Sequence, residues 1–344
     1  MKFVADKAIP FLEGLFEPNG VTVVYKDGRA ISREDLLDAE VLITRTRTRC
    51  DASTLEGTAV RLIATATIGT DHIDLPWCAA HGIGIVSAPG CNAGGVMDYV
   101  FSSLYGIASR KAIRLQGVPF GIVGVGHVGS RVAEMARKLG FEVLLNDPPR
   151  AAAEGPDGFC SLDYLLAHAG IVTLHIPLDE TTRGLADSEF FRKMRPETIF
   201  INAARGEVVD EAALLEALPK LGAVCLDTWC NEPNVNPGLM DRVDIATPHI
   251  AGYSYQGKQN GTAAVVRAIA RRYGFDDLLD WFPGTGGPED EAIRLDVAGK
   301  NQGEIAALFQ YNYPVFTDDF MFRLDPSGFE RIRAAYRYRR EFYI

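Results

Sequence analysis

Three polar residues in the second half of the chain have the side chains needed to move a proton and hold an anion. Arg205, Glu232 and His249 each follow a short apolar run within a few residues. Parallel strands end at the same edge of a sheet, and an open α/β sheet binds its ligand at that edge. We therefore expect the three side chains to converge.

The chemistry that these side chains suggest is the removal of hydride from a secondary alcohol. A neutral imidazole, with an ordinary pKa of about 6.5, is suited to accept the hydroxyl proton, which makes His249 the base. Glu232, bonded to the other ring nitrogen, would fix the tautomer and stabilise the imidazolium. Arg205 would hold a substrate carboxylate with its planar fork. His175, at the end of another predicted strand, is the rival base.

A glycine motif indicates where a hydride acceptor binds. Gly124, Gly126 and Gly129 follow the apolar run 120–123 with GxGxxG spacing and open an amphipathic helix. In a dinucleotide site the first glycine permits a tight turn, the second admits the pyrophosphate, and the third allows close helix packing. The helix N-terminus then offers N–H groups to the anion.

The acidic residue Asp147 ends the next predicted strand and favours NAD over NADP. Its carboxylate is placed to bind both ribose hydroxyls and would repel a 2′-phosphate. Arg150, three residues later, leaves the choice partly open.

Apolar runs that alternate with amphipathic stretches predict an α/β fold with parallel sheets. The strands expected in the first part are 3–5, 21–25, 41–44, 61–66 and 84–87. Those expected in the second are 120–123, 141–145, 171–175, 198–201, 223–226 and 244–246. A capping box at Ser32 and Asp35 predicts a helix start, and apolar spacing predicts a helix over 92–109.

Length and composition limit the classes of protein. A chain of 344 residues holds roughly two domains at about 150 residues each. With 45 acidic and 35 basic side chains the net charge is −10, which disfavours nucleic acid and anionic membranes as partners. The six cysteines and six histidines show no paired metal-ligand spacing, so we expect reduced thiols, no metal and a cytoplasmic location.

The glycine motif, the distal Asp147, the string 202–206, Glu232-Pro233 and Pro248-His249 occur in an order that resembles the D-isomer-specific 2-hydroxyacid dehydrogenases. The resemblance covers about residues 1 to 275. The strings 65–72, 88–93, 146–150 and 248–253 narrow it to members that oxidise 4-phospho-D-erythronate to 2-oxo-3-hydroxy-4-phosphobutanoate. It implies NAD as cofactor, a place in pyridoxal 5′-phosphate (vitamin B6) biosynthesis, and a cytoplasmic homodimer.

The resemblance gives Arg205, Glu232 and His249 the catalytic roles above and adds binding residues. Together with the motif glycines, the expected cofactor contacts are Gly124, Gly126, His127, Val128, Asp147, Ala204, Asp227 and Gly252. The expected substrate contacts are Arg45, Thr46, Thr67, Gly69 and Tyr253.

Three alternating arginines suit a phosphorylated substrate. On an extended segment Arg45, Arg47 and Arg49 would align on one face, as a doubly charged phosphate requires. The alternative is a solvated edge strand protected by charge. Arg45 is favoured, and which of the three touches the phosphate stays open.

The expected architecture has three parts. Residues 92–250 form a doubly wound NAD-binding Rossmann domain, 1–91 and 251–282 a split flavodoxin-like substrate (lid) domain, and 283–344 a small C-terminal dimerisation module. A Pro- and Gly-rich stretch at 283–288 reads as a linker. Arginines interleaved with aromatic residues over 331–344 favour a subunit interface over nucleic acid.

Two alternatives stay open. A dehydrogenase of another D-2-hydroxy acid, such as 3-phosphoglycerate, would share the same three catalytic residues. The scaffold is also similar to NAD-sensing regulatory modules of the C-terminal-binding corepressor type, where partner binding matters more than turnover.

Overall fold

The computed structural model describes residues 1–284 and 292–344, which form two compact units. The first unit comprises Met1–Asn92 and Ser254–Ala292, and the second Ala93–Tyr253 and Ile293–Ile344. The linker predicted at 283–288 falls mostly outside the described residues. Within the described ranges, no helix has the length and apolar character needed to cross a membrane.

The first unit is built on a five-stranded parallel sheet with the strand order β2-β1-β3-β4-β5. Its strands are β1 Lys2–Asp6, β2 Thr22–Lys26, β3 Val41–Thr44, β4 Leu62–Thr65 and β5 Gly84–Val86. Every residue of β3 and β4 is buried, as expected for central strands covered on both faces. The order is that of flavodoxin-like sheets, so the predicted fold of this part is confirmed.

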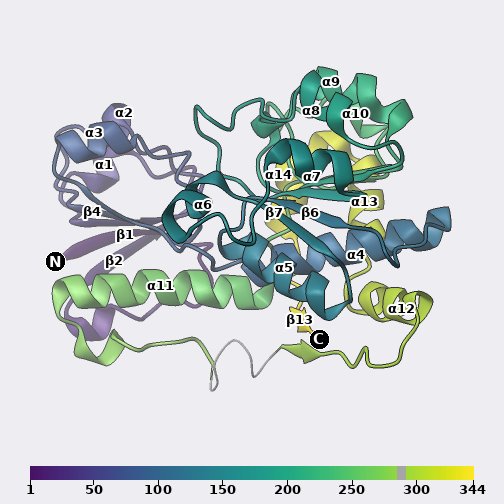
Figure 1. The fold of residues 1–344 in the computed structure, drawn as a ribbon. Helices are drawn as coiled ribbons and strands as arrows, with labels where there is room; N and C mark the ends of the chain where they lie inside the picture. The colour runs from purple at the N-terminus through teal and green to yellow at the C-terminus, as the bar shows by residue number, and fades with distance from the viewer. Residues whose placement is uncertain (285–291) are drawn as a thin grey trace. The chain divides into compact units, whose positions relative to one another are not determined.

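Helices cover both faces of this sheet. Figure 1 shows α11 along one face and α1, α2 and α3 over the other. Their bounds are α1 Arg33–Leu36, α2 Ala52–Leu55, α3 Leu75–Ala80 and α11 Tyr255–Tyr273. Phe3 packs with the residues of α11, whereas its neighbour Val4 packs on the opposite side, because successive strand side chains alternate. The predicted capping box is present, with Ser32 N–H donating to Asp35 at 2.8 Å.

The second unit holds a six-stranded parallel sheet with the order β11-β10-β9-β8-β6-β7. Its strands are β6 Phe120–Val123, β7 Val143–Asn146, β8 Ile171–Leu174, β9 Ile199–Asn202, β10 Ala223–Leu226 and β11 Ile245–Ala246. All six strands expected from the sequence are therefore present. The chain order reverses at β6, between its neighbours β7 and β8, which places a ligand crevice at the carboxyl ends of β6 and β8.

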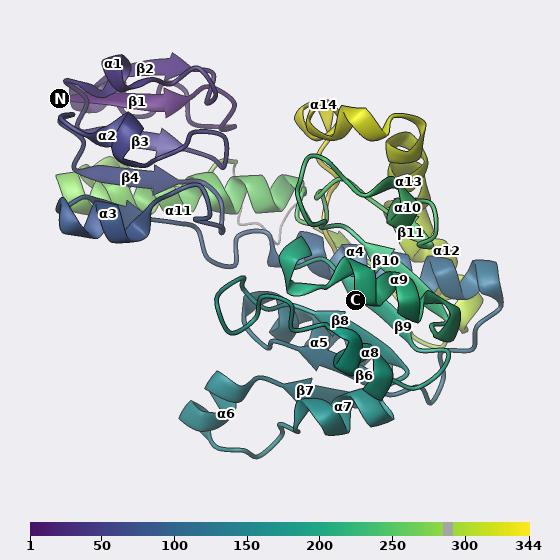
Figure 2. The ribbon, with the colours of Figure 1, turned by 90° about the horizontal axis from the view of Figure 1, so that it is seen from above.

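Two hydrophobic layers enclose this sheet. Figure 1 shows α4 and α5 below the strands and α7, α8 and α9 above them, and Figure 2, seen from above, has these last three helices nearer the viewer. The helices of the central part are α4 Ala93–Lys111, α5 His127–Lys138, α6 Pro148–Glu154, α7 Leu162–His168, α8 Ser188–Lys193, α9 Glu211–Ala217 and α10 Pro237–Met240. Helix α4 is buried around nearly its whole circumference, which explains its apolar sequence.

The C-terminal segment, defined as Ile293–Ile344, packs within the second unit. Its elements are β12 Ile293–Arg294, α12 Gln302–Asn312, α13 Val315–Leu324, α14 Phe329–Ala335 and β13 Phe342–Tyr343. Helix α12 packs on α4, and α13 packs on both α4 and β11. The Asp319 carboxylate accepts a 2.7 Å hydrogen bond from Ala246 N–H, so α13 covers the edge strand of the sheet.

Candidate active site

The three motif glycines occupy different environments at the carboxyl end of β6. A Cβ on Gly124, which has φ +86°, would lie 2.6 Å from His175 O, and one on Gly129 would lie 2.0 Å from Gly124 O. A Cβ on Gly126 would meet no described atom within 4 Å. Gly126 is also the N-cap of α5 and brings no side chain to its N–H groups. This open, donor-rich position fits a pyrophosphate.

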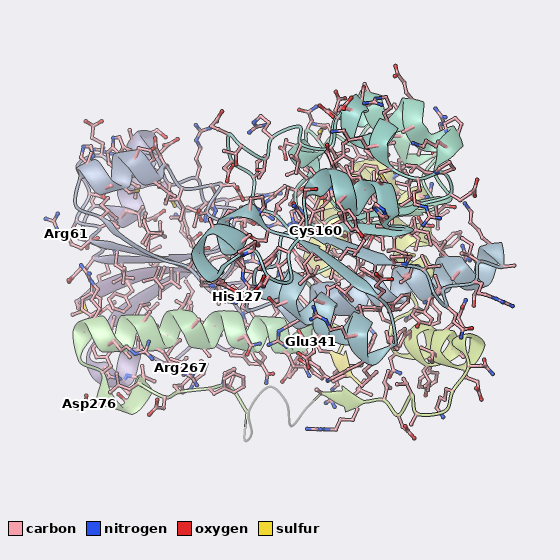
Figure 3. All side chains as sticks on the ribbon, in the orientation of Figure 1. Arg61, His127, Cys160, Arg267, Asp276 and Glu341 are labelled. Carbon is pink, nitrogen blue, oxygen red and sulfur yellow. The ribbon has the colours of Figure 1, made fainter. Side chains whose placement is uncertain are left out.

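His127 and Val128, the predicted cofactor contacts beside this position, open α5. His127 is exposed and Val128 is half-buried (His127 is labelled in Figure 3). Both therefore present their backbone and part of their side chains beside the anion position.

Asp147 is held at the end of β7 with its carboxylate against the glycine loop. Its Oδ2 accepts a hydrogen bond from Val125 N–H at 2.7 Å, and its Oδ1 accepts one from Arg150 N–H at 3.0 Å. Each carboxylate oxygen keeps a further lone pair for a ribose hydroxyl.

The Arg150 side chain binds a carboxylate of its own helix, α6, and a backbone carbonyl group of the glycine loop. Its guanidinium binds Glu154 through two bonds of 2.7 and 2.6 Å and donates to Val125 O at 2.6 Å. All of these bonds stay within the chain, and the choice of NAD over NADP rests on the Asp147 carboxylate, which would repel a 2′-phosphate.

His249 and Glu232 form the hydrogen bond expected from the sequence, with 2.8 Å between His249 Nδ1 and Glu232 Oε2. Trp229 N–H donates to the other oxygen, Oε1, at 3.0 Å. Burial by itself would raise the pKa of Glu232, but the charge and hydrogen bond of His249, Trp229 N–H and the charge of Arg333 outweigh it and lower that pKa. Glu232 is therefore a carboxylate that accepts its hydrogen bond from His249 Nδ1–H, and a neutral imidazole in this tautomer has its lone pair on Nε2.

The backbone of His249 lies in the left-handed region, with φ +56°. Such a conformation is strained for a residue with a Cβ and persists only where the surroundings fix it. His249 N–H donates to Asp227 O at 2.7 Å. The Asp227 carboxylate accepts bonds from Ile250 N–H at 2.8 Å and Ala251 N–H at 2.9 Å.

The carboxylate of Asp227, which is expected to contact the cofactor, thus binds the turn that follows His249. Thr247 Oγ1 adds a third bond to its carboxylate at 2.7 Å. Burial raises the pKa of Asp227, and the charge of His249 and these hydrogen bonds oppose the rise. Gly252, in the same turn, is half-buried. The contacts of both residues with the cofactor stay predictions.

Arg205 follows β9, in a loop that packs closely against the loop after β10. Asn202 holds this loop, donating from Nδ2 to Arg205 O at 2.9 Å and accepting at Oδ1 from Ala204 N–H at 3.1 Å. A Cβ on Gly206 would lie 1.9 Å from the backbone of Trp229. The glycine therefore lets the Arg205 loop lie against the loop that leads to Glu232.

The rival base His175 lacks the surroundings of a proton acceptor. Burial lowers its pKa to about 3. Its Nε2 lies 3.1 Å from Thr173 Oγ1, a neutral partner. An imidazole that resists protonation to this degree is a poor base near neutral pH.

In the first unit, Arg45 is bound to a buried carboxylate. Its Nε lies 2.9 Å and its Nη2 3.4 Å from the two oxygens of Asp6, which is 1% exposed. A Cβ on Gly28 would lie 2.5 Å from that carboxylate. The pair fixes the guanidinium at the carboxyl end of β3 with donors left over.

The prediction that Arg45, Arg47 and Arg49 lie on one extended segment is wrong. The chain turns at Thr46 and Arg47, and Arg49 forms an ion pair with Asp51, the N-cap of α2. Asp6 and Asp51 therefore hold two of the three guanidinium groups in different places. Thr46 is exposed in this turn.

The remaining predicted substrate contacts lie in loops. Thr67 Oγ1 lies 2.8 Å from Thr65 Oγ1, and the Thr67 hydroxyl also reaches Gly69 O at 3.4 Å. Tyr253, in the second unit, packs its ring 5.9 Å from Tyr336 and 6.2 Å from Tyr338. That these residues bind substrate stays a prediction.

The sequence reasoning assigned no site role to two arginines of the C-terminal segment. Arg333 lies with its guanidinium carbon 5.7 Å from the centroid of the Tyr253 ring, and Arg339 donates to the backbone of the turn after His249. The signal available was the mixture of arginines and aromatic residues, which does not reveal which side chains face inward.

A family model for the NAD-binding domain of D-isomer specific 2-hydroxyacid dehydrogenases matches residues 105–251. Curated proteins named erythronate-4-phosphate dehydrogenase are similar along most of the chain. The protein of Bacteroides fragilis is 38% identical over 99% of this chain and 97% of its own, and that of Yersinia pestis 40% over 99% and 93%. The protein of Chromohalobacter salexigens is 47% identical over 80% of this chain and 73% of its own.

Solved structures share the fold. The TT0316 protein of Thermus thermophilus aligns with a TM-score of 0.68 at 27% identity, over 80% of this chain and 97% of its own. An NAD⁺-bound 3-phosphoglycerate dehydrogenase of Entamoeba histolytica aligns with a TM-score of 0.67 at 24% identity, over 83% and 99%.

Proposed function

Because the chain belongs to the erythronate-4-phosphate dehydrogenases among the D-isomer specific 2-hydroxyacid dehydrogenases, we propose that it oxidises 4-phospho-D-erythronate to 2-oxo-3-hydroxy-4-phosphobutanoate with NAD. The family resemblance drawn from the sequence motifs is thereby confirmed. The reaction is a step in the synthesis of pyridoxal 5′-phosphate. The observation that carries the proposal is the 2.8 Å bond between His249 and Glu232 beside a nucleotide-binding crevice.

NAD is the cofactor, and when bound it supplies the nicotinamide ring that accepts the hydride. The open position at Gly126 and the free end of α5 fit its pyrophosphate. Asp147 would bind the ribose hydroxyls. Ala204, Asp227 and Gly252 are proposed as further contacts on the strength of their matching positions.

The chain's own groups account for the proton and the charge. His249 Nε2 accepts the proton of the C2 hydroxyl as the C2 hydrogen leaves with its electron pair. Glu232, held ionised by its surroundings, stabilises the resulting imidazolium. Arg205 binds the substrate carboxylate and polarises the oxygen that becomes a carbonyl.

We assign recognition of the substrate to Arg45, Thr46, Thr67, Gly69 and Tyr253. The support for Arg45 is its fixed guanidinium, since an arginine already held by a buried carboxylate loses little entropy on binding phosphate. The 2-hydroxy acid without phosphate would leave these donors unsatisfied.

We further propose a cytoplasmic homodimer formed through the C-terminal segment. Four large apolar side chains on α12 and α13 are exposed: Tyr311, Phe320, Met321 and Leu324. Apolar surface of this kind is typical of an interface between subunits. All six cysteines are free thiols in the described chain, as in a reducing compartment. Analytical ultracentrifugation tests the dimer, and a monomer at all concentrations would contradict it.

The test of the activity is the formation of reduced nicotinamide by purified protein with NAD. The substrates compared are 4-phospho-D-erythronate, 3-phosphoglycerate and D-erythronate, of which the last differs from the first only by the phosphate. We expect kcat/KM for 4-phospho-D-erythronate to exceed that for D-erythronate by about 10⁴, because D-erythronate leaves unpaired the donors that we assign to the phosphate. A preference for 3-phosphoglycerate would make the chain a different dehydrogenase. Tight NAD binding without turnover of any of the three would favour the regulatory alternative.

A further inference from the structure

Arg339 of the C-terminal segment binds the turn that directly follows the catalytic base. Its Nη1 donates to Ile250 O at 3.3 Å and to Tyr253 O at 3.0 Å, and its Nη2 donates to Ala251 O. Three carbonyl groups of one short turn therefore point at a single guanidinium. A charged donor makes stronger hydrogen bonds than a neutral one, so the cation fixes the path of this turn.

The guanidinium is itself held from other directions. Nη2 also donates to Gly95 O at 2.8 Å near the start of α4, and Nη1 donates to the Tyr336 hydroxyl at 3.2 Å. Its central carbon lies 3.8 Å from the centroid of the Tyr313 ring, which is a cation–π contact. Only a planar fork with five donors satisfies these partners together, and lysine does not reproduce it.

The tail that carries Arg339 is anchored on the same helix. Phe342 N–H donates to Asp98 Oδ2 at 3.1 Å, and β13 pairs with β12. The neighbouring Glu341, labelled in Figure 3, is 2% exposed. A Cβ on Gly94 would lie 2.1 Å from Glu341 Oε2, so a small residue at this point of α4 admits the tail.

The backbone of the turn after His249 is thus bound by two side chains of opposite charge. The anion binds its N–H groups, and the cation binds its carbonyl groups. The Asp227 carboxylate binds the N–H groups of Ile250 and Ala251, and the Arg339 guanidinium binds the carbonyl groups. His249 keeps φ +56° at the start of this turn. A strained residue keeps its conformation where the surroundings specify it more than once, and these two residues do so.

We propose that Arg339 is a positioning residue for the dehydrogenase reaction: through the backbone of the turn it keeps His249 Nδ1 on Glu232 and Nε2 presented to the substrate hydroxyl. The proposal rests on the proposed function, since it assigns His249 as the base. It extends the catalytic machinery to a residue 90 positions further along the chain, in a segment outside the matched family domain.

The test compares R339K and R339A in the full-length protein, with R337A as a matched control from the exposed side of the same tail. With NAD and 4-phospho-D-erythronate we expect kcat to fall about 100-fold in both Arg339 variants, because a small misplacement of a catalytic group has an effect of this size. R337A should stay within about twofold of the wild type. Millimolar guanidinium should restore at least part of the kcat of R339A while leaving R337A unchanged.

A second readout does not depend on turnover. The ring ¹⁵N–¹H spectrum of histidine, with His249 assigned by its absence in H249A, reports the Nδ1 proton bonded to Glu232. In R339K this resonance should broaden or shift, whereas it should be unchanged in R337A. Wild-type kcat together with an unchanged His249 resonance in R339K would overturn the proposal, and if R339A does not fold, R339K decides. No turnover by the wild type would instead contradict the proposed function, and the resonance would still test Arg339.

Discussion

At the scale of single residues, Glu232 and His249 form the hydrogen-bonded pair to which we assign the proton transfer, and removing the imidazole tests whether catalysis can be separated from binding. H249A should lower kcat/KM by at least about 10³ because no group then accepts the hydroxyl proton. NAD affinity, measured by titration of NADH fluorescence, should change less than about threefold. H168A, which removes an exposed helix-end imidazole, is the control. Full activity of H249A would exclude His249 as the base.

The role that we propose for Arg205 depends on the shape of its side chain as well as on its charge. R205K keeps the charge but loses the paired donors that match a carboxylate. We expect KM for 4-phospho-D-erythronate to rise and kcat to fall, with a loss of about 10²-fold in kcat/KM. Steady-state kinetics measures this change. Wild-type kcat and KM for R205K would contradict the assignment of Arg205 to the substrate carboxylate.

Glu232 also links stability to pH. Its pKa in the folded protein is lowered, so the ionised form contributes stability above the ordinary glutamate pKa of about 4.3, and this contribution is lost as the pH falls through the folded pKa. The wild type should therefore be more stable than E232Q at neutral pH, and the difference should shrink below about pH 4. Urea unfolding of both proteins across this pH range measures it. A difference that grows in acid would reverse the assignment.

At the scale of elements, the loop between β6 and α5 contains one glycine that close packing requires, Gly129, and one that we expect cofactor binding to require, Gly126. A methyl group at Gly129 would overlap the Gly124 carbonyl, whereas one at Gly126 enters open space. G129A should destabilise the protein by about 1–3 kcal/mol, and G126A should leave its stability nearly unchanged. G126A should nevertheless weaken NAD binding at least tenfold, since its methyl group occupies the pyrophosphate position. Thermal unfolding and NADH titration distinguish the two; unaltered NAD affinity in G126A would place the pyrophosphate elsewhere.

At the scale of the whole molecule, the C-terminal segment stabilises the unit that holds the catalytic residues. Phe322 of α13 is fully buried, with ring centroids 6.3 Å from Trp229 and 5.7 Å from Phe329. F322A should cost about 3–5 kcal/mol of unfolding free energy through the cavity it leaves. T317A, which shortens an exposed side chain on the same helix away from the proposed interface residues, should cost less than about 0.5 kcal/mol. Urea denaturation at one protein concentration and one oligomeric state tests both.

The sequence by itself determined the parallel strands, the nucleotide-binding loop and the pairing of Glu232 with His249. Each of these depends on local signals: short apolar runs, glycines at fixed spacing, and polar residues just beyond strand ends that parallel topology brings to one edge. The family resemblance rested on the same local strings. The roles of the individual site residues stay predictions.

Only the tertiary structure decided which partner each charged side chain has. Arg45 binds Asp6, 39 positions away along the chain, and Arg339 binds the carbonyl group of Tyr253, 86 positions away, although both occur in similar arginine-bearing stretches. The predicted extended arginine face is wrong because the chain turns at Thr46 and because Asp6 and Asp51 bind two of the guanidinium groups. A charge is satisfied by whatever the fold brings near it, and contacts between residues far apart along the chain leave no periodic trace in the sequence.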